Sequence, residues 1–142
     1  MNELSDYDFA EGIEVLDVDE CLRLLRQGGV GCLGLPSVGA PELRPVNFVV
    51  DGRSIVIRTG EGQILEAGRR GIAASFQIYG IDPLEHTGWS VSASGKLSQI
   101  VTDQRTLSLH LRPWASGRKD RFVKLFLSQI SGRRIPPGRG NR

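Results

Sequence analysis

The sequence predicts a mainly β domain with short helices (α+β), in which a small barrel of strands is joined by helical connections. Three observations predict this fold class. β-rich runs recur with turn residues between them, helical periodicity is confined to short segments, and the 142 residues include 18 glycines. That pattern is typical of small barrels. One domain is expected over residues 17–135, between an acidic arm (1–16) and a disordered basic tail (136–142).

The first elements are placed by their capping residues. A helix is predicted for residues 18–27 because Asp17 can cap its amino end, with Glu20 at capping-box spacing. Gly28-Gly29 can end this helix. The apolar, β-branched run at residues 30–35 then predicts a strand.

A central hairpin is predicted around Asp51-Gly52. Residues 45–50 and Ser54–Thr59 are both rich in strand-forming residues, and Asp-Gly between two such runs favours a type I′ turn. With Asp51 and Gly52 in the turn, Val50 pairs with Arg53, and the whole register of the hairpin follows.

Alternation along the two strands gives each face of the hairpin a role. One face is apolar and is expected in the core, through Val46, Phe48, Ile55 and Ile57. The other face carries Asn47, Val56 and Arg58, so it displays an amide and a guanidinium side by side. The loop after the second strand leads into a helix at Gln63–Arg70, whose first N–H groups can attract an anion. The hairpin is therefore predicted to bind a ligand.

The remainder of the chain is predicted as a series of strands with one further helix. In order these elements are a strand at 72–79, a loop at 80–88, a strand at 89–101 with a bulge or bend at Gly95, a helix at 103–111 and a strand at 121–130.

Composition excludes several function classes. A hydrophobic content of 39% and a charged content of 24% are ordinary for a globular protein, and no apolar run approaches the ~20 residues of a membrane span. The acidic amino terminus is unlike a signal peptide. Cys21 and Cys32 lie in apolar surroundings, which favours a reduced, cytoplasmic setting with both thiols buried. The two histidines and the absence of a nucleic-acid motif argue against a metal site and nucleic-acid binding.

The charges are distributed unevenly. The first 20 residues carry eight acids and no lysine or arginine, whereas the segment from Arg112 onward is strongly basic. Two interpretations remain open: a solvated arm and tail, or a basic end that meets a phosphate or an acidic partner.

A set of short motifs resembles a known family. They are Gly-Gly-Val-Gly-Cys-Leu after the first helix, Pro45-Val46-Asn47, Arg58-Thr59-Gly60, His-Thr-Gly-Trp-Ser-Val at 86–91, Trp114, and Ile-Ser-Gly-Arg-Arg at 130–134. Their order and spacing resemble the pyridoxamine 5′-phosphate oxidase-like family, in its actinobacterial-type branch, from about residue 17 to residue 135.

The resemblance implies a homodimeric split β-barrel of the FMN-binding type. It implies an FMN-dependent oxidoreductase acting on a small molecule, with the cofactor in a groove at the dimer interface. The residues implied beside the isoalloxazine ring are Pro45, Val46, Asn47, Trp89, Ser90 and Val91. Those implied near the phosphate are Arg58, Thr59, Gly60, Gln63 and Ile64, and Trp114 is implied to reach the site from the partner subunit.

The chain departs from the family pattern at two places. Many relatives have Ser-Lys where this chain has Gln63-Ile64, and many have arginine where Cys32 stands. Alternative functions therefore stay open: a deazaflavin-dependent reductase, a non-catalytic flavin-binding protein, or a dimer that holds no cofactor. The residues suggest no nucleophile–base pair, which suits an enzyme whose cofactor carries the chemistry.

Overall fold

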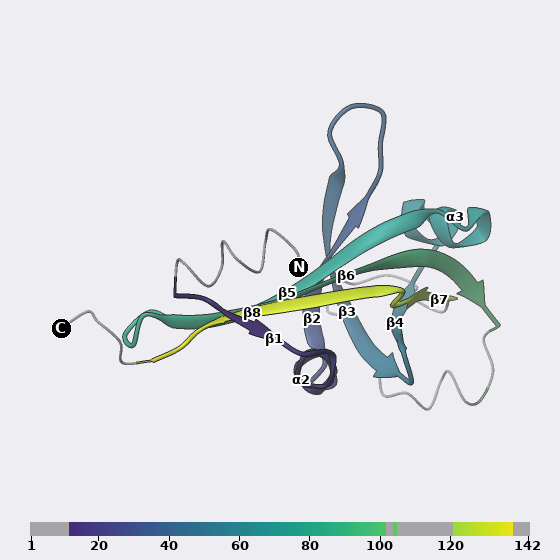
Figure 1. The fold of residues 1–142 in the computed structure, drawn as a ribbon. Helices are drawn as coiled ribbons and strands as arrows, with labels where there is room; N and C mark the ends of the chain where they lie inside the picture. The colour runs from purple at the N-terminus through teal and green to yellow at the C-terminus, as the bar shows by residue number, and fades with distance from the viewer. Residues whose placement is uncertain (1–11, 102–103, 105–120, 138–142) are drawn as a thin grey trace.

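A computed structural model describes residues 12–101, 104 and 121–137 of the chain (Figure 1). Within them the elements are β1 (Glu14–Leu16), α2 (Val18–Leu25), β2 (Gly29–Leu35), β3 (Glu42–Asp51), β4 (Ser54–Thr59), α3 (Gln63–Arg70), β5 (Ala73–Asp82), β6 (Thr87–Ile100), β7 (Arg121–Phe126) and β8 (Gln129–Ile135). None of the described helices is long and apolar enough to cross a membrane.

The strands form one antiparallel sheet that closes into a barrel. Its order is β1-β8-β6-β5-β2-β3-β4-β7, and an additional pairing of β7 with β6 closes the six strands β2 to β7. Closure leaves these strands without open edges. Strands β8 and β1 extend the sheet beyond β6, and the paired ends of β5, β6 and β8 form the long arm at the left of Figure 1. The predicted small barrel with short helices is confirmed.

One large hydrophobic cluster fills the barrel. The rings of Phe48 and Phe76 meet edge to face with centroids 4.9 Å apart, a favourable aromatic geometry. Helix α2 adds Leu24 and Leu25, and α3 adds Leu65. Both helices therefore pack their apolar faces against the sheet.

Strand β6 changes partners at Gly95. It pairs with β8 up to Ser94 and with β7 from Leu97 onward. A Cβ atom at Gly95 would lie 1.7 Å from the carbonyl oxygen of Phe126. The sequence predicts a bulge or bend here, and the structure shows that a close approach of two backbones requires glycine.

Both described helices begin at the predicted residues, but α2 ends at Leu25, two residues before its predicted end at residue 27. The Asp17 carboxylate accepts a hydrogen bond from the Glu20 N–H at 2.8 Å and caps α2. The Glu20 side chain does not complete a capping box but binds Arg23, with a shortest nitrogen–oxygen distance of 2.6 Å. The Arg23 guanidinium accordingly holds the pKa of the Glu20 carboxyl below its usual range. Helix α3 begins and ends at the predicted residues, and Gly71 ends it with a φ of 67°.

The predicted register of the central hairpin is wrong by two residues. Asp51 pairs with Ser54 and Phe48 with Ile57, so Gly52 and Arg53 form the turn. Within the hairpin only Gly52 has a positive φ, 63°. A turn with glycine first is typical of type II′ rather than the predicted type I′. Because a shift of two preserves alternation, the predicted faces of the hairpin are unchanged.

The predicted loop at residues 80–88 is mostly strand. Strand β5 runs to Asp82 and β6 begins at Thr87. The turn between them is held by the Asp82 carboxylate, which accepts hydrogen bonds from the N–H groups of Leu84 and Glu85 at 3.1 and 3.2 Å. Gly80 continues the strand because the Trp89 indole lies directly over it, 2.7 Å from where a Cβ would sit.

The predicted single strand at residues 121–130 is two strands. Backbone contacts break it, since Leu127 N–H donates to the carbonyl of Arg53 and Ser128 N–H to that of Ser94, both at 3.0 Å. The end of the acidic arm forms β1, which pairs with β8. The predicted helix at 103–111 lies outside the described residues, apart from residue 104. Of the predicted tail at 136–142, only residues 136 and 137 are described.

Candidate functional site

The outer face of the sheet carries a groove built from small polar side chains. We define the outer face as the side of β4, β3, β2, β5, β6 and β8 that points away from the core. One row of cross-strand partners on it comprises Pro45, Cys32, Gln77, Ser92 and Ser131. These residues are adjacent only because the topology sets β2 beside β5 and β8 beside β6.

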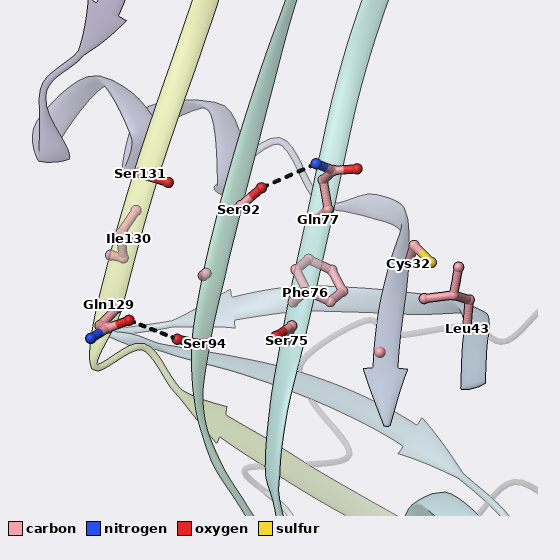
Figure 2. A pocket seen from close by; sticks show the side chains of 12 residues that line it. Cys32, Leu43, Ser75, Phe76, Gln77, Ser92, Ser94, Gln129, Ile130 and Ser131 are labelled. Atoms are coloured by element: carbon pink, nitrogen blue, oxygen red, sulfur yellow. Dashed lines mark hydrogen bonds between the residues drawn. The ribbon is translucent and has the colours of Figure 1, made fainter. Parts of the chain in front are cut away.

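A second row runs parallel to the first and completes the groove. It comprises Leu43, Gly34, Ser75, Ser94 and Gln129. The groove encloses about 560 Å³. In Figure 2 the hydroxyl and amide groups lie along β8, β6 and β5, while Cys32 and Leu43 stand on β2 and β3 at the other side.

Hydrogen bonds link the polar side chains across strands. The Gln77 amide donates to the Ser92 hydroxyl at 3.1 Å, and the Ser94 hydroxyl donates to the Gln129 amide oxygen at 3.3 Å (Figure 2). None of the described residues that line the groove is charged. The surface therefore presents hydroxyl and amide groups to an uncharged ligand or to another protein face.

Cys32 and Cys21 occupy different environments. Cys21 is fully buried in the core as predicted, and burial raises the pKa of its thiol, with the carboxylates of Asp17 and Glu20 adding to the shift. Cys32 is half-buried on the groove wall. The prediction that Cys32 is a buried apolar residue is therefore wrong, because its side chain points to the outer face.

Two residues implied for ligand binding share this outer face. Asn47 on β3 and Arg58 on β4 each lie one residue beyond the last pair of the hairpin ladder, Phe48 with Ile57. Both side chains are half-buried. Pro45 is exposed on the same face of β3. The structure thus brings Pro45, Asn47 and Arg58 together at one end of the hairpin.

Arg58 also contacts an aromatic ring. Its guanidinium carbon lies 5.6 Å from the centroid of the Phe122 ring, within the range of a cation–π interaction. Phe122 is buried, together with Val56, in a small apolar cluster that also includes Val49 and Ile100.

Several other implied site residues face the core instead. Val46 and Val91 are 8% and 0% exposed within the hydrophobic cluster. Thr59 is buried, and its hydroxyl donates to the carbonyl of Gly60 at 3.4 Å. Ile64 is half-buried and packs against the same cluster. The side chains of Val46, Val91 and Ile64 thus pack in the core and do not point to the outer face.

The start of α3 is surrounded by charged residues. The Gln63 amide oxygen accepts a hydrogen bond from the Arg44 guanidinium, which also binds Glu42 at 2.9 Å. Glu61 pairs with Arg69 at 3.4 Å and with Arg121 at 3.8 Å. Arg44 therefore places a guanidinium at the first residue of α3, beside Ile64 in the sequence.

The implied Trp89-Ser90 segment lies on the arm, away from the hairpin. Ser90 is on the outer face and pairs with Tyr79 and Arg133. Trp89 faces the opposite side, where it is half-buried and packs against the core. It also borders a second hollow of about 370 Å³. Trp114 lies outside the described residues.

Sequence reasoning missed the groove residues. The signal was present as alternating small polar residues, Ser75 with Gln77 on one strand and Ser90, Ser92 and Ser94 on the next. Alternation alone marks a strand face that is not core. It does not reveal which other strands stand beside that face.

The chain matches a protein-family model over most of its length. Residues 17–134 match the model described as pyridoxamine 5′-phosphate oxidase. An uncharacterized protein of Mycobacterium tuberculosis is 29% identical over 133 residues, which cover 89% of this chain and 88% of the relative.

Solved structures show the same fold. A FAD-binding protein of Mycobacterium smegmatis is 27% identical with a TM-score of 0.67, covering 87% of this chain and 99% of the other. A FAD-binding protein of Mesorhizobium loti is 21% identical with a TM-score of 0.72, covering 87% of this chain and 99% of the other. The second likeness shows the fold alone.

Proposed function

Because the chain belongs to the pyridoxamine 5′-phosphate oxidase family, we propose that it binds a flavin on its outer face and acts as a flavin-dependent oxidoreductase on a small molecule. The observation that carries this proposal is the placement of Asn47 and Arg58 on one face, at the end of the hairpin ladder. The M. smegmatis neighbour, which is named as a FAD-binding protein, supports a flavin rather than another cofactor.

The residues present fit a flavin mononucleotide. Pro45 and the exposed Val30 offer apolar contact to a flat ring, and Asn47, the cross-strand partner of Val30, offers an amide that can donate and accept hydrogen bonds. Arg58 offers a cation for a phosphate. When bound, a flavin supplies hydride or single-electron transfer, while the chain holds the ring, shields it from water and sets its electrostatic surroundings.

The visible spectrum of the purified protein tests the proposal. We expect a yellow protein that releases a flavin on denaturation, and chromatography of the released cofactor distinguishes FMN from FAD. If the protein is colourless and cannot be reconstituted with FMN, FAD or riboflavin, the proposed function is wrong. Reconstitution with a deazaflavin alone would favour a deazaflavin-dependent reductase.

Replacing Asn47 by leucine is expected to change the bound flavin and leave the fold intact. Leucine has a similar size but no hydrogen-bonding group, so the absorption maxima or the reduction potential of the flavin should shift. Spectroscopic titration and potentiometry measure the change. Gln27→Leu, an exposed amide at the end of α2, is the matched control. An unmoved spectrum in Asn47→Leu would remove this residue from the site.

We further propose that a second copy of the chain covers the outer face. The described residues that line its groove are uncharged, and Leu43, Tyr79 and Ile81 on the same face are 70%, 65% and 69% exposed. Depletion of charge at the centre and exposed apolar side chains are typical of the interior of protein interfaces. A flat ring also needs a second wall to be removed from water.

A charge placed in this face is expected to separate the two copies. Ser131→Glu would bury an unpaired carboxylate in the interface, so sedimentation at micromolar concentration should show a dimer for the wild type and a monomer for the variant. Ser37→Glu, in the exposed loop between β2 and β3, should remain dimeric. A wild-type monomer, or a Ser131→Glu dimer, would overturn the proposal.

A further inference from the structure

Arg58 is one member of a row that crosses three strands on the outer side of the barrel. It is the direct cross-strand partner of Phe122 on β7, and Phe122 is the partner of Ile100 on β6. Side chains of directly paired residues lie on the same face and close together. The Arg58 guanidinium and the Phe122 ring are therefore held as neighbours by the sheet itself.

The Phe122 ring is fixed by its surroundings. Although it points to the outer side of the barrel, it is only 1% exposed, because it packs against Val56, Val49 and Ile100. A buried ring of this kind has few rotamers available. Packing against these side chains therefore restricts the position of the ring.

The geometry points to a positioning role for Phe122. The Arg58 guanidinium carbon lies 5.6 Å from the ring centroid, where the negative face of the ring attracts a cation. A long arginine side chain loses conformational freedom when a contact holds it, so the ring pre-organises the guanidinium on the face that also carries Asn47. We infer that Phe122 sets the affinity of the site for a ligand phosphate without touching the ligand. This inference rests on the proposed flavin function.

Fluorination of the ring tests this role with only a small change in the size of the ring. Site-specific replacement of Phe122 by mono-, tri- and pentafluorophenylalanine progressively reduces the negative electrostatic potential at the ring face. We expect FMN affinity to fall stepwise, by about five- to tenfold for the pentafluoro ring, and riboflavin affinity to stay within about twofold, because only FMN carries the phosphate. A purely structural role for the ring would give no such trend.

Phe126 provides a matched control on the same strand. It lies on the same face of β7 and is 51% exposed, and the cation–π contact in the described part of the chain involves Phe122 and not Phe126. Fluorination of Phe126 should leave both affinities unchanged. Equal weakening of FMN and riboflavin by fluorinated Phe122, or no weakening of either, would overturn the inference.

A measurement on the ligand-free protein separates this inference from the flavin proposal. The ring current of Phe122 should shift the Arg58 Nε–H resonance upfield, and Phe122→Leu should abolish that shift in a protein that remains folded. An unchanged resonance in Phe122→Leu would overturn the positioning role, whatever the flavin titrations give. A wild-type protein that binds neither FMN nor riboflavin would overturn the proposed function, while the resonance still decides whether Phe122 holds Arg58.

Discussion

Replacing Gly95 by alanine is expected to destabilise the protein by at least about 3 kcal/mol, which is at the upper end of overpacking effects. The added Cβ would lie 1.7 Å from the carbonyl oxygen of Phe126. The carbonyl belongs to the backbone, and the position of a Cβ is fixed by the backbone that carries it. No side-chain rotation can relieve the clash. Strand β6 must therefore move away from the end of β7 at the point where it changes partners, which weakens both pairings.

Urea denaturation with matched glycine variants measures this effect. Gly34→Ala is the control, because its Cβ would meet Leu43 and Ser75 at 3.6 and 3.8 Å, ordinary contact distances. We expect Gly34→Ala to change stability by less than about 1 kcal/mol. A Gly95→Ala protein as stable as the Gly34→Ala control would show that the strand crossing is looser than the structure indicates.

The features that the sequence predicted correctly are those set by local chemistry. Asp17 caps α2 and Gly71 ends α3, and both signals lie within a few residues of the element they bound. The faces of the central hairpin were also predictable, because alternation survives a shift of two residues. The turn of this hairpin was misplaced because Asp51-Gly52 and Gly52-Arg53 are both favourable two-residue turns. Each of them contains Gly52.

The features that the sequence could not predict depend on distant contacts. The break between β7 and β8 is made by hydrogen bonds from Leu127 and Ser128 to Arg53 and Ser94, residues far away in the chain. The extension of β5 through Gly80 depends on the Trp89 indole across the hairpin. A propensity argument continues the strand through Leu127 and Ser128 and ends the other strand before Gly80, because it does not include the partner strand.

The residues of the candidate site show the same contrast between local and distant contacts. Asn47 and Arg58 were found because they lie on one hairpin, whose pairing is local. The groove residues Cys32, Gln77, Ser92 and Ser131 come from four different strands. Their adjacency follows from the strand order of the barrel, which local sequence patterns do not reveal.

Arg58→Ala is expected to weaken FMN by about ten- to a hundredfold and riboflavin by less than about twofold. A charge-assisted hydrogen bond to a phosphate contributes ~1.5–3 kcal/mol, which corresponds to this range of affinity. Riboflavin lacks the phosphate and keeps only the ring contacts. The loss of FMN affinity should also shrink as salt rises, because Arg58 is half-buried and its charge is partly screened.

Titration of both ligands against three proteins tests this prediction. Arg26→Ala, which removes an exposed charge at the end of α2, controls for the change in net charge and should bind both ligands like the wild type. The free energy of unfolding should be measured for each variant, because the Arg58 guanidinium also lies over the ring of Phe122. If Arg58→Ala weakens FMN and riboflavin equally, Arg58 acts through the fold, and the phosphate must be sought at another cation. Arg44 is then the next candidate, since its guanidinium binds Gln63 at the start of α3.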